Sequence, residues 1–169
     1  MKKLLVVVDM QKDFVTGALG SKDAVAILPN VMEKLRLARQ NGEEIVFTRD
    51  THFENYPSTQ EGQKLPVLHC VKGSDGWEIM DGLHNGERVF DKPTFGSLEL
   101  AEFVKEEEFS EVELIGVCTD ICVVSNALLI KAYCPETRVK VDANCCAGVS
   151  KESHDAALKT MAACQVEIL

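Results

Sequence analysis

The sequence predicts an α/β protein in which helices flank a mostly parallel sheet, built as one domain over residues 1–169. Short β-rich segments alternate with segments of helical periodicity along the whole chain, which is typical of parallel sheets. No internal repeat, low-complexity segment or linker interrupts that alternation. The chain has 169 residues, 46% of them hydrophobic, which is enough for one domain with a sizeable core.

The first half of the chain supplies two predicted strands and one predicted helix. Leu4–Val8 is continuously apolar, as expected for a strand that is covered on both faces. Ala24–Gln40 carries apolar residues at helical spacing, Asn41-Gly42 ends that helix, and Glu44–Thr48 follows as a strand. Arg49–Gly86 then shows many turn formers and no long periodicity, and connections of that length tend to be functional.

The second half of the chain continues the alternation. The predicted helices are Leu98–Glu108, Asp120–Tyr133 and Lys151–Ala163, and the predicted strands are Arg88–Phe90, Val112–Val117, Val139–Asp142 and Val166–Leu169. In a parallel sheet the ligand site lies beyond the carboxyl ends of the strands. Polar residues that directly follow a predicted strand are therefore the candidates for chemistry.

Composition excludes several classes of partner. The formal net charge is −9 and no basic stretch is longer than Lys2-Lys3, so a nucleic acid is not an expected partner. No apolar run approaches the roughly 20 residues of a membrane-spanning helix. Seven cysteines, an odd number, lie mostly inside apolar segments, which indicates a reducing compartment rather than a secreted disulfide scaffold. We therefore expect a cytoplasmic protein with no nucleic-acid or membrane partner.

Two charged residues stand at predicted strand ends. Asp9 directly follows the first strand, where burial tends to raise a carboxyl pKa into the range useful for proton transfer. An equally good interpretation of Asp9 is a turn residue that accepts backbone hydrogen bonds. Lys92 follows the third strand, where a lysine is usually a surface charge. Beside an acid and a thiol, Lys92 would instead favour the carboxylate and thiolate forms.

One of the cysteines is distinguished by its position. Thr119 is a natural N-cap for the predicted helix that runs to Tyr133, which places Cys122 in the first helical turn. There the helix dipole and free amides would stabilise a thiolate, and the same amides would hold the oxyanion of a tetrahedral intermediate. The alternative is that Cys118 and Cys122 are paired metal ligands, although they lack a second pair or a nearby histidine pair.

A possible metal site lies in and before the long loop. Asp50 and His52 are two residues apart at the end of the second strand, so their side chains share one face. His69 follows within the loop, and Glu61 lies between. An aspartate and two histidines suit zinc, manganese or iron, although loop histidines are also common as solvent-facing hydrogen-bonding residues. The remaining histidines lack comparable neighbours and are predicted to be surface residues: His84 and His154.

Five segments together resemble the isochorismatase-like cysteine hydrolases, and among these the nicotinamidases, in the same order over nearly the whole chain. They are Val7–Phe14, Thr48–His52, His69–Ser74, Asp91-Lys92 and Gly116–Val123, of which the last is the most specific. The resemblance implies a three-layer αβα fold around a six-stranded sheet. It also implies metal-dependent hydrolysis of a small amide, nicotinamide first, to the acid and ammonia through a cysteine thioester.

The resemblance also implies roles for particular residues. The implied catalytic residues are Asp9, Lys92 and Cys122, and the implied oxyanion hole is formed by the amides of Cys118 and Cys122 after a cis peptide bond between Val117 and Cys118. The implied ligands of a divalent metal, zinc first and then manganese or iron, are Asp50, His52, Glu61 and His69. The implied substrate-binding residues are Phe14, Phe95 and Val117, with Trp77 as a looser lid candidate. Relatives of this type often self-associate, so a homo-oligomer is a further expectation.

Other functions fit some of the same residues. A family member that acts on another small amide or on isochorismate would use the same nucleophile. This alternative stays open because Leu98 stands where related nicotinamidases commonly carry an aromatic residue that packs against the substrate ring. A thiol redox sensor would use Cys118 and Cys122, but it leaves Asp9 and Lys92 unexplained. A metal-binding module without catalysis leaves the cysteine segment without a role.

Overall fold

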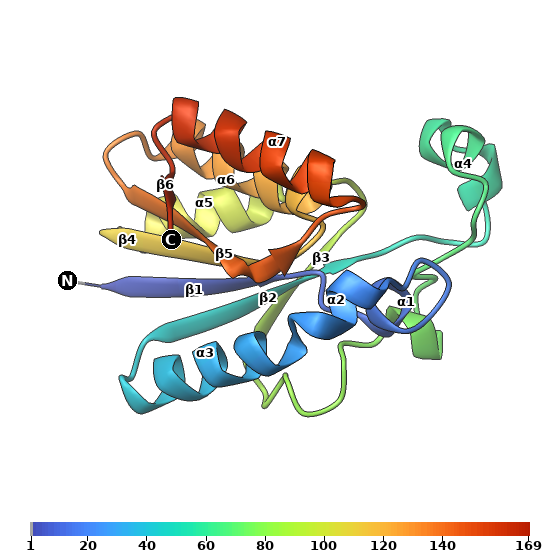
Figure 1. Cartoon of the computed structure of the whole chain (residues 1–169), viewed down its shortest axis with the longest axis horizontal. Coiled ribbons are helices and arrows are strands. Elements are labelled where there is room, and N and C mark those ends of the chain that lie inside the picture. The colour runs from blue at the N-terminus through green and yellow to red at the C-terminus, as the bar shows by residue number, and fades with distance from the viewer. Residues whose placement is uncertain (1) are drawn as a thin grey trace.

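The computed structural model describes residues 2–169 and contains one six-stranded sheet with all neighbouring strands parallel (Figure 1). The strands are β1 (Lys3–Val8), β2 (Glu44–Asp50), β3 (Arg88–Lys92), β4 (Glu111–Val117), β5 (Arg138–Ala147) and β6 (Glu167–Ile168). Their order across the sheet is β3-β2-β1-β4-β5-β6. The predicted α/β class and the six-stranded sheet are therefore confirmed.

Helices cover both faces of the sheet and complete the three layers (Figure 1). On one face lie α1 (Lys12–Val15), α2 (Lys22–Ala26) and α3 (Leu28–Gln40), and on the other lie α5 (Leu98–Glu106), α6 (Val124–Tyr133) and α7 (Lys151–Ala163). The short helix α4 (Gln60–Lys64) projects beyond the carboxyl end of the sheet in this view. No helix within residues 2–169 has both the length and the apolar character needed to cross a membrane.

The first strand shows why the sheet is covered on both faces. Leu4, Val6 and Val8 pack into one apolar cluster with residues of α5, α6 and α7, whereas Leu5 and Val7 pack into a second cluster with residues of α1, α2 and α3. Side chains alternate between the faces of a strand, so a continuous apolar run is required here. β1 thus lies at the centre of the fold, and the residue after it is deeply buried.

Two differences between the predicted elements and the structure have clear local causes. The predicted helix Ala24–Gln40 is two helices that meet at Ile27, because Pro29 has no N–H and its ring conflicts with the carbonyl four residues earlier. The strand predicted over Val139–Asp142 extends as β5 to Ala147, past a register shift between Leu114 and Gly116. That irregularity interrupts the side-chain alternation by which a strand is recognised in a sequence.

Candidate active site

Four chemically active side chains meet at the carboxyl edge of the sheet. Asp9 follows β1, Asp50 ends β2, Lys92 ends β3, and Cys122 lies in the turn that follows β4. These strands are neighbours in the sheet, and Asp50 and Lys92 are directly paired in the β2–β3 register. The structure therefore brings together the strand-end residues that the sequence identified.

Lys92 is the hub of this cluster. Its Nζ lies 2.6 Å from Asp9 Oδ2, 3.4 Å from Asp50 Oδ1 and 3.4 Å from Cys122 Sγ. The Lys92 side chain is 1% exposed and Asp9 is fully buried, so these charges interact with little solvent screening. Burial opposes the ammonium, but the negative charge of Asp9 and its other neighbours outweighs burial and raises the Lys92 pKa. Lys92 is therefore a permanent cation beside the thiol.

Asp9 is held as a proton acceptor. Burial, reinforced by the charge of Asp50, raises the Asp9 pKa, while Lys92 and the Thr48 hydroxyl oppose that rise. Thr48 donates to Asp9 Oδ1 at 2.6 Å, which fixes one carboxylate oxygen. The other oxygen, Oδ2, has no hydrogen-bond partner within residues 2–169, although it is in ion-pair contact with Lys92. A carboxylate oxygen has more than one lone pair, so Oδ2 can receive a proton while it stays in contact with Lys92.

Burial disfavours the thiolate form of Cys122. Burial, followed by the charge of Asp9, raises its pKa well above the ordinary value, and Lys92 only partly opposes this. The stabilisation of a thiolate expected from the helix start is therefore outweighed here by desolvation, since the residue is 5% exposed. Deprotonation of Cys122 instead requires transfer of its proton to a neighbouring base.

The turn that carries Cys122 differs from the predicted helix start. Residues Thr119–Val123 form a π-helical turn before α6, and Cys118 rather than Thr119 is its N-cap residue. The prediction that Thr119 caps the helix is wrong, since its hydroxyl contacts His154 Nδ1 at 2.7 Å. The peptide bond between Val117 and Cys118 is cis, as the resemblance implied. Gly116, at φ +118°, precedes it in a place where any side chain would collide with the Val8 carbonyl.

The backbone of this turn is organised around the Cys118 carbonyl. It accepts the Ile121 and Val123 amides at 3.1 and 3.0 Å, on either side of Cys122. The oxyanion hole that the resemblance implied, formed by the amides of Cys118 and Cys122, stays a prediction.

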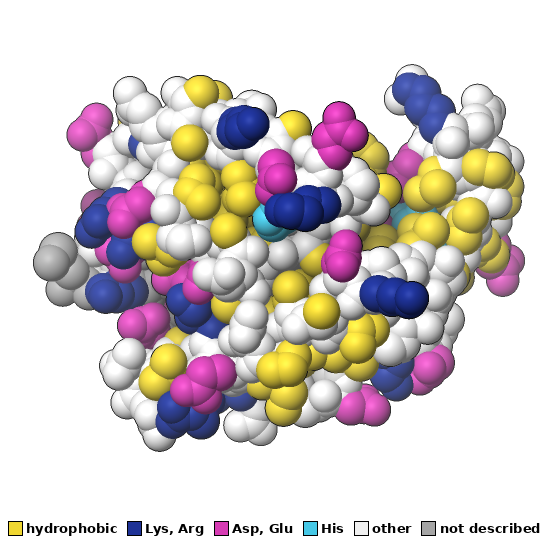
Figure 2. Space-filling view, viewed as in Figure 1, with side chains coloured by type: hydrophobic (Ala, Val, Ile, Leu, Met, Phe, Trp, Pro, Cys, Tyr) yellow, Lys and Arg dark blue, Asp and Glu magenta, His cyan; other side chains and the backbone are white. Residues whose placement is uncertain are grey.

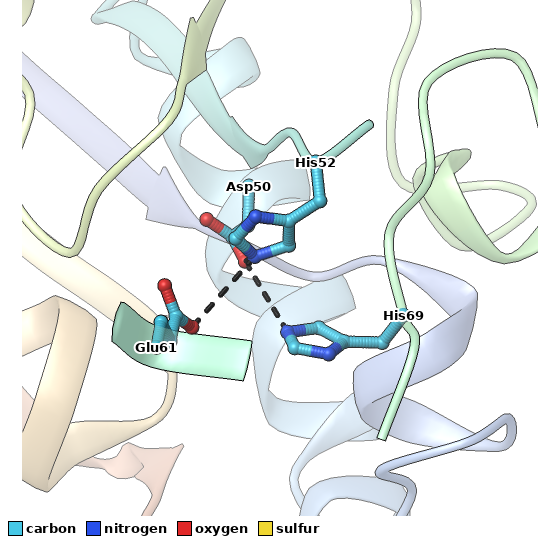
Figure 3. A group of neighbouring side chains, drawn as sticks. All are labelled: Asp50, His52, Glu61 and His69. Carbon is cyan, nitrogen blue, oxygen red and sulfur yellow. Dashed lines mark ion pairs between the residues drawn. The ribbon is translucent and has the colours of Figure 1, made fainter. Parts of the chain in front are cut away.

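The second cluster consists of Asp50, His52, Glu61 and His69, and Figure 3 shows the four side chains converging. One potential ligand atom from each lies within 4.8 Å of all the others. His52 Nε2 is 2.9 Å from Asp50 Oδ2, and His69 Nε2 is 3.6 Å from the same oxygen. Glu61 comes from the projecting α4, with Oε1 3.7 Å from His52 Nε2. All four of the ligands that the resemblance implied are therefore adjacent.

The donor set fits a divalent cation. His52 Nε2 is buried and has no hydrogen-bond partner within residues 2–169, despite its short distance to Asp50. His69 Nδ1 contacts the Val67 carbonyl at 2.7 Å, which directs the lone pair of Nε2 into the cluster. Burial and the nearby charge of Asp50 raise the Glu61 pKa, so a cation between the two carboxylates would relieve their repulsion. Two nitrogens and two carboxylates are a common ligand set for zinc, manganese or iron.

Asp50 belongs to both clusters. Its Oδ1 faces Lys92, and its Oδ2 faces the two histidines. Burial would raise its pKa, but the adjacent His52 and His69 side chains and the charge of Lys92 outweigh burial and lower it. The catalytic and metal-type groups thus form one continuous polar centre.

Polar residues that follow β1 hold this centre, and they were not predicted from the sequence. Gln11 is fully buried, and its side chain bonds both the amide and the carbonyl of Asp50 at 2.7 and 2.9 Å. It also donates to the Trp77 carbonyl at 2.9 Å. Asp13 accepts the Cys70 amide at 2.7 Å, directly after His69. The sequence signal that could have indicated them is the spacing of Gln11 and Asp13, two polar residues two positions apart shortly after a buried strand.

Replacing Gln11 by leucine is expected to destabilise the fold. The change leaves the buried Asp50 amide and the Trp77 carbonyl without partners, and each unsatisfied group costs about 1–3 kcal/mol. Chemical denaturation should show a lower free energy of unfolding, whereas the same change at the exposed Gln40 should leave it nearly unchanged. Equal stability of the two variants would contradict this role of Gln11.

The predicted substrate-binding residues lie in different settings. The Phe14 ring packs against His69, with 5.5 Å between ring centroids, so it stands at the edge of the metal-type cluster. Phe95 is 42% exposed, and its carbonyl accepts from Asn126, which also bonds the Cys122 carbonyl. The Val117 side chain lies in the core, so the site receives only its peptide bond. Contact with substrate stays a prediction for all three residues.

Two further expectations meet different outcomes. Trp77 is 8% exposed and its Nε1 donates to Thr51, so it is part of the loop's interior rather than a lid. His84 is exposed, as predicted. His154 is half-exposed, but it contacts Thr119, so the expectation that it lacks a partner of note is wrong. That contact was not predictable because it joins two elements 35 residues apart.

A buried thiol beside a carboxylate and an ammonium, at the carboxyl edge of a parallel sheet, defines the class of protein as a cysteine hydrolase. The chain belongs to the isochorismatase domain family, which matches residues 3–169.

Solved structures and curated relatives agree with that membership. A pyrazinamidase of Pyrococcus horikoshii in complex with zinc superposes with a TM-score of 0.88 at 29% identity, covering 100% of this chain and 99% of the other. A pyrazinamidase/nicotinamidase of Streptococcus mutans gives a TM-score of 0.86 at 30% identity, covering 99% and 100%. A probable inactive nicotinamidase of Arabidopsis thaliana is 30% identical over 93% of this chain and 86% of its own length. The chain is thus about equally similar to proteins named as pyrazinamidases and to one described as a probable inactive nicotinamidase.

Proposed function

We propose that the protein is a metal-dependent nicotinamidase that converts nicotinamide and water to nicotinate and ammonia. The observation that carries the proposal is the contact of one buried ammonium, Lys92, with Asp9, Cys122 and Asp50. Asp50 in turn belongs to the four-residue cluster with metal-ligand chemistry. Similarity to proteins described as pyrazinamidases and nicotinamidases supports the choice of substrate.

In the proposed first half-reaction, Asp9 accepts the proton of the Cys122 thiol while Lys92 stabilises the resulting charges. The thiolate then attacks the amide carbonyl carbon, and the oxygen gains negative charge. The amides of Cys118 and Cys122 stabilise that oxygen. Asp9 returns its proton to the nitrogen as the C–N bond breaks, so ammonia leaves and the acyl group stays on Cys122 as a thioester.

In the second half-reaction, Asp9 removes a proton from a water molecule, which attacks the thioester carbonyl. The C–S bond breaks, the sulfur regains a proton from Asp9, and the acid leaves. Asp9 therefore accepts a proton twice and donates one twice in each turnover. Its Oδ2, which has no hydrogen-bond partner within residues 2–169, is the atom available for these transfers. Lys92 stays charged throughout, because its pKa is raised by its neighbours.

Asp50, His52, Glu61 and His69 would hold the divalent ion. When bound there, the ion supplies a Lewis-acid position for the ring nitrogen of the substrate and orients the amide. The neighbouring Phe14 ring would limit the position of the substrate ring on the His69 side. Under this proposal zinc is the first expectation, and manganese or iron would serve the same purpose.

Removing the metal is expected to lower both activity and stability. A chelator should reduce kcat/KM by roughly tenfold or more, because the substrate loses an orienting contact. Added zinc at about 100 times its Kd should stabilise the fold by about 2.7 kcal/mol and raise the Tm. Both effects should disappear in His52→Ala, while an exposed control, His84→Ala, should keep them. Chelation without effect on turnover or Tm would contradict a metal-dependent site.

The direct test is ammonia and nicotinate release from nicotinamide by purified, zinc-supplied protein. One ammonia should appear for each nicotinate. A panel of other small amides and isochorismate then tests the alternative substrates. If nicotinamide is not turned over but another compound of the panel is, the substrate is reassigned. If no compound of the panel is turned over, the hydrolase proposal is overturned.

A redox-sensor function has less support. Burial raises the pKa of Cys118 to about 12 and the pKa of Cys122 well above its ordinary value, and thiols held in the protonated form oxidise slowly. Mild oxidant should therefore leave the pair reduced.

We infer that the protein acts in the cytoplasm on a small molecule. All seven cysteines are free, which suits a reducing compartment. Figure 2 shows basic and acidic side chains interspersed over one face, without a continuous basic stripe of the kind that binds nucleic acid. Self-association stays a prediction.

A further inference from the structure

His154 contacts the nucleophile turn from outside the site described above. It lies on α7, and its Nδ1 is 2.7 Å from Thr119 Oγ1. Thr119 is fully buried and directly follows Cys118. Its carbonyl accepts the Val124 amide, which closes the π-helical turn around Cys122. The contact therefore links the turn that carries both oxyanion amides to a helix in the outer layer.

A second contact joins the same turn to the connection that leads into α7. Asp120 Oδ1 accepts the Val149 amide at 3.0 Å, so the connection between β5 and α7 is bonded to the nucleophile turn. The connection packs closely against both residues at Gly148. A side chain there would not fit, because its Cβ would lie 2.9 Å from both Asp120 Oδ1 and His154 Cβ. The turn is therefore held at two successive residues, Thr119 by a side-chain contact with α7 and Asp120 by its carboxylate, which accepts a backbone amide just before α7.

We propose that His154 is a positioning residue for the nucleophile turn, and this proposal rests on the proposed hydrolase function. His154 touches neither the thiol nor the amide that is cleaved. It holds Thr119, and Thr119 sets the position of the Cys118 amide on one side and of the Cys122 turn on the other. Attack on a carbonyl is sensitive to such geometry, and a displacement of about 1 Å costs on the order of 100-fold in rate. His154 thus acts on catalysis through Thr119.

Four variants test the contact. His154→Leu removes the hydrogen-bonding atom, and His154→Asn keeps a polar atom close to the position of Nδ1. Thr119→Val removes the hydroxyl at almost constant volume, and the fourth variant combines Thr119→Val with His154→Leu. Asp155→Asn is the matched control on α7, because Asp155 contacts only the exposed Lys151 among its charged neighbours.

The expected result is a loss in kcat without a matching change in KM. His154→Leu and Thr119→Val should each lower kcat for nicotinamide roughly tenfold, and the double variant should lose little more than either single one. His154→Asn should recover most of the activity, and Asp155→Asn should retain it. Losses that multiply in the double variant, or a kcat for His154→Leu within about twofold of the wild type, would overturn the proposal.

Amide hydrogen exchange gives a readout that does not depend on turnover. In His154→Leu, the amides of residues 118–124 should exchange faster than in the wild type, while those of α7 keep their protection. Unchanged exchange in the turn, or equal acceleration throughout α7, would overturn the positioning role. Failure of the wild type to hydrolyse nicotinamide would instead overturn only the proposed function, and hydrogen exchange would still decide the role of His154.

Discussion

Cys122→Ala is expected to abolish nicotinamide hydrolysis, with a loss of roughly 10⁴-fold or more, since removal of a covalent nucleophile eliminates the thioester route. No other cysteine substitutes for it. Among the buried cysteines, only Cys122 is in contact with the Lys92 ammonium within residues 2–169. The measurement is ammonia release by zinc-supplied protein, with circular dichroism and the Tm as checks that the variant is folded.

The matched control for this variant is Cys145→Ala. Cys145 is also buried, at 3% exposed, but it packs in the core between the sheet and α1–α3. Its replacement should lower stability slightly and leave kcat close to that of the wild type. Turnover by Cys122→Ala at more than a few per cent of the wild-type rate would show that hydrolysis proceeds without the thiol.

Asp9→Asn has the second-largest expected effect, a loss of roughly 10²–10⁴-fold in kcat. An amide cannot accept the thiol proton, and burial keeps the Cys122 pKa too high for spontaneous ionisation near neutral pH. The substitution also leaves the Lys92 ammonium without its closest partner, so a lower Tm is expected alongside the loss of activity. Asp142→Asn, at an acidic residue of β5 that pairs with Lys34, is the control that should keep its kcat.

The pH dependence gives a further check on the role of Asp9. Its pKa is raised in the folded protein, so its carboxylate is lost on acidification at a higher pH than for an ordinary aspartate, near 3.9. The acidic limb of kcat/KM should therefore lie above that value in the wild type and be absent from the residual activity of Asp9→Asn. An unchanged acidic limb in the variant would assign the titration to another group.

Much of the fold follows from the pattern of apolar residues. β1 was recognisable because Leu4–Val8 must be buried on both faces, and α7 because its predicted bounds, Lys151–Ala163, are those of the structure. The break before Pro29 was not predicted. The spacing of apolar residues indicated one continuous helix, and it was given more weight than the steric effect of proline. The extension of β5 depended on an irregular pairing with β4, which has no signature in one strand alone.

The site was predictable where its residues follow strands. Asp9, Asp50 and Lys92 each end or follow a strand, and a parallel sheet places all carboxyl ends on one edge. Which strands are neighbours is a property of the whole sheet, so the sharing of Asp50 between Lys92 and the histidines was not predictable. The raised pKa of Cys122 was also not predictable, because burial depends on surrounding elements and here outweighs the helix start.

The supporting residues share one reason for being missed. Gln11, Asn126 and His154 make hydrogen bonds to segments at least 29 residues away in the sequence, and glutamine and asparagine do not by themselves indicate catalysis. Their importance follows from burial together with hydrogen bonding to the backbone or side chains of the site. Such residues become visible only once the fold has placed their partners.

The most direct test of the central claim is a crystal structure of the zinc-supplied protein with pyridine-3-carbaldehyde, in which an aldehyde replaces the amide of nicotinamide. A thiol nucleophile adds to an aldehyde to give a tetrahedral hemithioacetal that resembles the proposed intermediate. The predicted result is a bond between Cys122 Sγ and the aldehyde carbon, with its oxygen on the amides of Cys118 and Cys122 and the ring nitrogen directed at the metal ligands. An aldehyde bound in the site without a bond to Cys122, or with its ring turned away from His52 and His69, would contradict the account.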